Sequence, residues 1–208
     1  MRNPGKYKYN NNQESGVRII LLISLFMLAS CAQVNEETPR KLKGNFFDLK
    51  AEGIRHFVDG QYEKSIPYLY TASLHRPDDS ETLGALGDAM LRTGRNKEGI
   101  KFLQQAIKAS PYDTRPRFAL GNAYKILGKY DQAAKEFLSI LDTKPNNLVA
   151  IGSLGDTYYK SGNYEGCVKQ FKRFIKLVEA KDPARLSESD KRFYELAKDQ
   201  KTSCQKHL

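Results

Sequence analysis

The sequence predicts an all-α protein: a solenoid of four helical hairpins followed by a C-terminal capping helix. Two glycine columns and one proline column recur at an interval of 34 residues. This period, with helix-compatible composition between the columns, is typical of stacked helix pairs that bury their apolar faces against neighbouring pairs. The columns are Gly53, Gly87, Gly121 and Gly155; Gly60, Gly94, Gly128 and Gly162; and Pro77, Pro111 and Pro145.

Local signals place the ends of the helices within each copy. The second glycine column predicts a left-handed residue that ends each first helix. Asp79, Asp113 and Asn147 follow the proline turns and are expected to cap the next first helix. The first glycine column predicts a close approach of the paired helix, against a small residue of that helix. Those small residues are Ser65, Gly99, Ala133 and Cys167.

These columns resemble the tetratricopeptide repeat. The third copy carries the family pattern as Leu120-Gly121, Tyr124, Gly128, Tyr130, Ala133, Phe137 and Pro145. The first copy departs most from the pattern, as a terminal repeat with one neighbour can. The resemblance implies a right-handed superhelical solenoid. The expected repeat domain is 44–180, with copies at 46–79, 80–113, 114–147 and 148–181.

The segment after the fourth copy predicts a capping helix over 187–206. Ser187 with Asp190 has the spacing of a helix-starting capping box. Its apolar stripe is expected to contain Phe193, Leu196, Ala197 and Cys204, with charged residues on the outer side.

Residues 1–30 predict a secretory signal. A basic stretch precedes the apolar run 19–28, which has about half of the roughly 20 residues needed to span a membrane. The sequence Leu28-Ala29-Ser30-Cys31 then resembles the lipobox of bacterial lipoproteins, which implies a lipid on Cys31. The polar segment 31–43 is expected to be a flexible tether. The alternative is a buried Cys31 at the end of an N-terminal helix.

The charge balance argues against nucleic acid as a partner. The formal charge is +10, but cleavage after residue 30 would remove four basic residues and one acidic residue and leave +7. An exported, lipid-anchored protein would direct that surplus to acidic proteins, anionic headgroups or cell-wall polymers. Ala32 after the lipidated residue favours the outer membrane of the bacterial envelope, by resemblance to lipoprotein sorting in enteric bacteria.

Residues for catalysis are sparse, and the sequence predicts neither an enzyme nor a cofactor. His56, His75 and His207 have no metal-ligand spacing, so no metal site is expected. The glycines follow the repeat and do not form a phosphate-binding loop.

The tetratricopeptide resemblance implies a concave groove lined by the first helices. Mixed apolar and charged residues there suit an extended peptide or a partner helix, and three aromatic residues are expected to face water without a packing role. The alternative is a merely solvated inner face. The expected groove residues are Phe57, Asp88, Arg92, Arg115, Phe118, Asn122, Lys125, Asp156, Tyr159 and Lys160.

Two function classes follow from these features. The first is a membrane-anchored envelope adaptor or assembly factor that binds a protein or peptide partner. The second is a receptor or carrier for a small ligand or cell-wall polymer. Some family members clamp a C-terminal carboxylate, but Ile54, Ala85 and Ala119 replace three of the polar clamp residues here.

Cys167 and Cys204 are candidates for a disulfide between the last hairpin and the cap. An oxidising envelope would permit it, and both residues are expected to face inward. The alternative is a small packing residue at 167 and an unrelated thiol at 204, because a bridge needs Cα atoms within about 7 Å.

Overall fold

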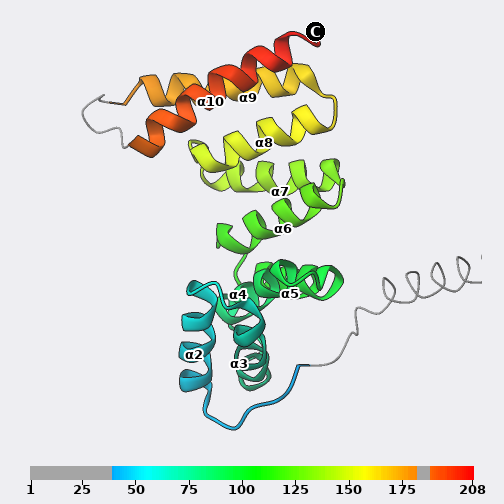
Figure 1. Ribbon diagram of the computed structural model, residues 1–208, viewed down its shortest axis with the longest axis vertical. Helices are drawn as coiled ribbons and strands as arrows, with labels where there is room; N and C mark the ends of the chain where they lie inside the picture. Colours follow the sequence, from blue (N-terminus) through cyan, green and yellow to red (C-terminus); the bar gives the residue numbers. More distant parts are fainter. Residues whose placement is uncertain (1–38, 182–187) are drawn as a thin grey trace, which may run out of the picture. The chain divides into compact units, whose positions relative to one another are not determined.

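The computed structural model describes residues 39–181 and 188–208. The signal segment 1–30, Cys31 and the expected helix start at Ser187 lie outside these residues. The described residues form nine helices and no strand, as the sequence predicts (Figure 1). The first two hairpins are α2 (Phe46–Val58) with α3 (Tyr62–His75) and α4 (Ser80–Arg92) with α5 (Asn96–Ala109). The next two are α6 (Thr114–Ile126) with α7 (Tyr130–Thr143) and α8 (Leu148–Lys160) with α9 (Tyr164–Glu179), and α10 (Glu188–Gln205) follows.

Each first helix begins at an Asx cap. The side chains of Asp79, Asp113 and Asn147 accept hydrogen bonds from backbone N–H groups of the first turn, at 2.8, 2.9 and 3.0 Å. These three predicted caps are confirmed. Asn45 completes the column by accepting from the Asp48 N–H at 3.0 Å. An Asx side chain is favoured here because it satisfies a backbone donor that has no partner within the helix.

The turn inside each hairpin contains a left-handed glycine. Gly60, Gly94, Gly128 and Gly162 have φ values of +73°, +83°, +72° and +78°. Only glycine adopts this conformation without a steric cost from Cβ, so the predicted helix ends are confirmed.

The first glycine column permits the closest helix contacts. A Cβ atom placed on Gly87 would lie 2.8 Å from the carbonyl oxygen of Gly99 on α5, and one on Gly121 would lie 2.8 Å from the Phe137 ring on α7. The predicted small partners Ser65, Gly99, Ala133 and Cys167 are all buried, but only Gly99 is the nearest neighbour of its glycine. The atoms nearest a Cβ on Gly53, Gly121 and Gly155 belong to Leu69, Phe137 and Phe171.

Successive hairpins pack side by side to give buried clusters along the solenoid. The largest cluster runs from Leu103 on α5 through Phe137 and Phe171 to Cys204 on α10.

Pro67 lies in the second turn of α3, one turn later than the first-turn position expected for a proline in a helix.

The capping helix α10 differs from the predicted pattern. Ala197 and Cys204 are buried, but Phe193 and Leu196 remain 60% and 49% exposed. The predicted single stripe is therefore wrong for these two residues, because α9 covers only the side of α10 that carries Ala197 and Cys204. None of the described helices is long and apolar enough to cross a membrane.

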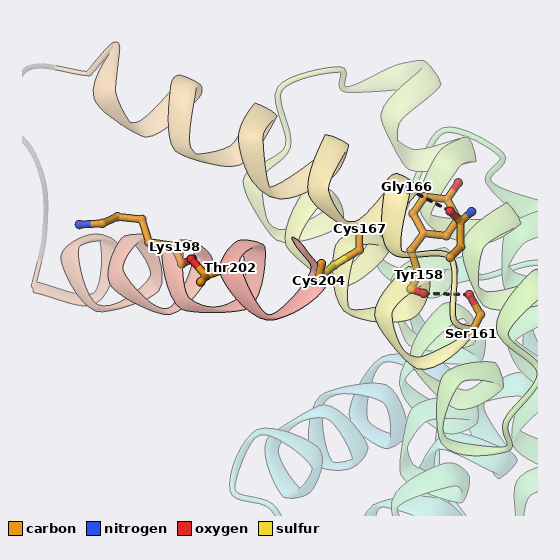
Figure 2. The surroundings of a disulfide bond; sticks show 8 residues. Tyr158, Ser161, Gly166, Cys167, Lys198, Thr202 and Cys204 are labelled. Atoms are coloured by element: carbon orange, nitrogen blue, oxygen red, sulfur yellow. Dashed lines mark hydrogen bonds between the residues drawn. A yellow bond between two sulfur atoms is a disulfide. The ribbon is translucent and has the colours of Figure 1, made fainter. Parts of the chain in front are cut away.

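A disulfide joins Cys167 of α9 to Cys204 of α10, with their Cα atoms 6.2 Å apart. Figure 2 shows the two helices side by side at this bridge. Both cysteines are fully buried. The bond ties the end of the cap to the largest core cluster, which contains both cysteines.

Candidate functional site

Three cavities follow one another along the first helices. The N-terminal cavity, about 270 Å³, lies between α2, α4 and α6 and includes Phe57 and Asp88. The central cavity, about 660 Å³, lies between α4, α6 and α8. The cap pocket, about 430 Å³, lies between α8, α9 and α10. Asp88 and Arg115 line the first two cavities, and Lys125 and Val149 line the last two, so the three form one groove.

The structure brings eight of the ten predicted groove residues to this groove. They are Phe57, Asp88, Arg92, Arg115, Phe118, Asn122, Lys125 and Asp156. Tyr159 and Lys160, at the end of α8, line none of these three cavities. Tyr159 packs instead near the rings of Tyr164 and His207, at centroid distances of 6.0 and 6.2 Å.

The aromatic residues of the groove have packing partners, contrary to expectation. The Phe118 ring is half-buried, with its centroid 5.7 Å from that of Phe137 in the core. Phe57 is half-buried against Tyr62, at 5.6 Å. The expectation that these rings face water without a packing role is therefore wrong. Truncating Phe118 would lower stability as well as change the groove, because its ring borders the core.

The cations of the groove are paired with acids of the groove. Lys125 on α6 contacts Asp156 on α8 at 2.8 Å, and its side chain is only 18% exposed. Lys160 also lies 3.7 Å from Asp156, and Arg92 lies 3.3 Å from Asp88. Arg92, Lys125 and Lys160 are thus each paired with a carboxylate rather than free to attract acidic groups, although Lys125 and Lys160 share Asp156.

Ion pairs at the first two repeats follow the same rule. Lys50 of α2 contacts Asp79 and Glu81 at 3.0 and 2.8 Å. Burial alone would lower the pKa of Lys50, but hydrogen bonds to Glu81 and Asp79 raise the pKa above its ordinary value. Burial would raise the pKa of Asp79, yet hydrogen bonds from Thr82 and Lys50 hold the pKa below its ordinary value. The pair therefore stabilises the fold across neutral pH, and this contribution is lost as the pH falls below about 3.8.

Arg115 of α6 pairs with Asp113, the cap residue of its own helix. Its guanidinium contacts the Asp113 carboxylate at 2.8 Å, and hydrogen bonding to Arg115 lowers the pKa of Asp113. The three cavities of the groove are lined by three cations and four carboxylates. They are Arg92, Arg115 and Lys125 against Glu81, Asp88, Asp113 and Asp156. The chain's positive surplus therefore lies outside the groove.

The exposed apolar surface of the groove comes from residues other than the ten predicted groove residues. Ile126 at the end of α6 is 81% exposed and Val149 at the start of α8 is 61% exposed. The repeat pattern could have indicated both, since each occupies a first-helix column that faces away from the paired helix. The repeat pattern could not indicate Phe193 and Leu196, which line the cap pocket, because α10 lies outside the repeat.

The residues described by the structure hold no group of three or more His, Cys, Asp or Glu side chains able to bind a metal ion. What the groove offers is shape, apolar contact and hydrogen bonding. This is the chemistry of a binding surface.

The fold is a tetratricopeptide-like solenoid. Tetratricopeptide-repeat models match residues 50–114 and 114–147. Among solved structures, MamA is 24% identical with a TM-score of 0.65, and the match covers 69% of this chain and 78% of MamA. These matches confirm the predicted fold.

Two further structures share the fold. YrrB, described as a tetratricopeptide protein with an unusual peptide-binding site, is 20% identical with a TM-score of 0.58, covering 64% of this chain and 68% of YrrB. The first repeat domain of Spaghetti (RPAP3), bound to an HSP90 peptide, is 21% identical with a TM-score of 0.52, covering 55% of this chain and 93% of that domain. No curated protein sequence matches this chain.

Proposed function

We propose that this protein is a non-catalytic interaction adaptor that binds a peptide segment of a partner protein in the groove. The observation that carries the proposal is the continuous groove itself, in which exposed Ile126 and Val149 alternate with polar side chains such as Asn122. Apolar side chains held in a concave surface are a common feature of ligand sites. Peptide binding by YrrB and by the RPAP3 domain supports the same use of this fold.

The groove proposal predicts that Ile126→Ser with Asn122→Ala weakens partner binding about tenfold. Ile126 is almost fully exposed and Asn122 has no packing role as a core residue, so the fold should be retained. Binding of peptides selected from a random-sequence library against the full chain would be measured by titration calorimetry. The matched control is Leu138→Ser on α7, an exposed apolar residue outside the groove. Equal loss in the control, or no loss in the groove variant, would contradict the proposal.

We further propose that the protein is anchored to the bacterial cell envelope by a lipid on Cys31, in the outer membrane where the cell has one. Cys31 lies outside the described residues, and the proposal rests on the basic stretch, the apolar run 19–28 and Leu28-Ala29-Ser30-Cys31. The polar segment 31–43 would let the repeat domain stand away from the bilayer. In this position the adaptor would hold its partner near the membrane.

Changing Cys31 to Ser is expected to abolish incorporation of labelled fatty acid and to move the protein out of the membrane fraction. The thioether to diacylglycerol needs the cysteine sulfur, and a hydroxyl does not replace it. Leu138→Ser is the control, since it changes an exposed residue and leaves both the lipobox and the Cys167–Cys204 disulfide intact. Unchanged labelling and fractionation of the Cys31 variant would rule out the anchor.

A further inference from the structure

The cap pocket is an apolar cavity that the repeat pattern does not require. Its floor is formed by the buried rings of Phe171 and Phe174, and its rim by Val149 of α8 with Phe193 and Leu196 of α10. Three of these five residues are at least 49% exposed. In a folded protein such a cluster of exposed apolar residues around a concave floor indicates a binding site.

Gly152 opens this pocket. It occupies the column of Lys50, Gly84 and Phe118, so the first and third repeats carry a side chain at this position and the second and fourth do not. A Cβ atom on Gly152 would lie 3.8 Å from the Phe174 ring, an ordinary contact distance. The absence of a side chain is therefore not required by helix packing, and its consequence is open space above Phe174.

The charge of the groove restricts what can enter this space. At the boundary with the central cavity, the ammonium group of Lys125 contacts the Asp156 carboxylate at 2.8 Å. An acidic ligand would have to displace that carboxylate, and a basic ligand would have to displace Lys125. Lys160 also lies 3.7 Å from Asp156 but does not line the pocket. Within the pocket lining, Lys125 and Asp156 compensate each other, and such a paired, half-buried site favours an uncharged apolar group.

We propose that the cap pocket is the anchor site of the groove, and that it accepts one bulky apolar side chain (Phe, Trp, Leu or Met) of a peptide segment without net negative charge. The inference rests on the proposed peptide-binding function and specifies the ligand of that site. Lys125 and Val149 line both the pocket and the central cavity, so a segment lying along the groove passes the pocket mouth. Central, desolvated apolar anchors contribute most of the binding energy in interfaces of this type.

The test is selection of random-sequence peptides on the full chain, followed by depletion on a Gly152→Leu variant, whose side chain would fill the pocket. Peptides that bind the wild-type chain but not this variant are expected to share a bulky apolar residue and to lack an excess of Asp and Glu. Because the chain contains no Trp, the emission of a Trp in such a peptide reports its own burial. We expect a blue shift with the wild-type chain, and binding about tenfold weaker with Gly152→Leu and with Phe193→Ser.

Matched variants separate pocket filling from loss of folding. Leu138→Ser removes an exposed apolar group elsewhere and should bind as the wild-type chain does. Gly152→Ala adds only a Cβ at an ordinary contact distance, so it should weaken binding less than Gly152→Leu does. Circular dichroism of each variant should show unchanged helix content. If Gly152→Ala still binds the pocket-dependent peptides and Gly152→Leu does not, the volume of the added side chain is the cause of the weaker binding.

Three outcomes would overturn the inference. The first is that every groove-binding peptide tolerates Gly152→Leu, which leaves the proposed adaptor function intact. The second is that the pocket-dependent peptides are acidic and lack bulky apolar residues. The third is a wild-type dimer that Phe193→Ser dissolves, which would assign the pocket to a second copy of the chain. Failure to select any peptide sensitive to Ile126→Ser with Asn122→Ala would instead contradict the proposed function itself.

Discussion

Removing the Cys167–Cys204 disulfide is expected to lower the free energy of unfolding by about 3 to 4 kcal/mol. The two cysteines are 37 residues apart, so the bond restricts a loop of that length in the unfolded chain. The variant is Cys167→Ala with Cys204→Ala, because alanine already occupies the matching buried position at Ala133. Urea denaturation of the variant and of the oxidised wild-type chain measures the difference, and amide hydrogen exchange in α10 should accelerate most.

The control for this prediction is a count of free thiols in a Cys31→Ser background. With two cysteines left, the unfolded and unreduced protein should show no free thiol. Two free thiols would contradict the bridge. A chain whose unfolding does not change on reduction would contradict its contribution to stability.

Gly87→Ala is expected to destabilise the second repeat by about 2 to 3 kcal/mol, although alanine favours a helix over glycine by about 1 kcal/mol. The added Cβ would lie 2.8 Å from the Gly99 carbonyl oxygen and 3.0 Å from the Leu103 backbone nitrogen. Those are backbone atoms of the paired helix, which can yield only if α5 moves away from α4. Urea denaturation measures the loss.

Two other glycines provide matched comparisons for Gly87. Gly121→Ala meets only the Phe137 ring, a side chain that can shift, and should cost less than Gly87→Ala. The heavy atom nearest to a Cβ on Gly152 would be 3.8 Å away, in the Phe174 ring, so Gly152→Ala should be neutral or stabilising by up to about 1 kcal/mol. Similar stabilities for all three variants would show that the backbone contact at Gly87 does not determine the cost of adding a Cβ there.

Much of the groove could be assigned from the sequence, because residues 34 positions apart occupy equivalent places in successive repeats. Asp88 and Asn122 fall in one column of the first helices, and both line the central cavity. The polarity of that cavity could not be assigned in the same way. Lys125 and Asp156 are 31 residues apart, and their contact depends on the distance between α6 and α8 rather than on either column. A cation that looks free along the sequence is therefore neutralised in the folded chain.

The same limit applies to Phe118. Its column faces the groove, but the ring is large enough to reach Phe137 on the paired helix. Residue type and period give the direction in which a side chain leaves the helix, whereas the depth to which it is buried depends on the packing distance between helices.

By itself the sequence determined the helices, their caps and left-handed turns, and the order in which hairpins stack, because these depend on contacts within one repeat or between identical positions of adjacent repeats. The tertiary structure alone decided the charge balance of the groove and the cap pocket. That pocket forms where α10 packs on α9 and leaves Phe193 and Leu196 beside Gly152. Since α10 has no counterpart in the repeat, no period along the chain could place its side chains against α8.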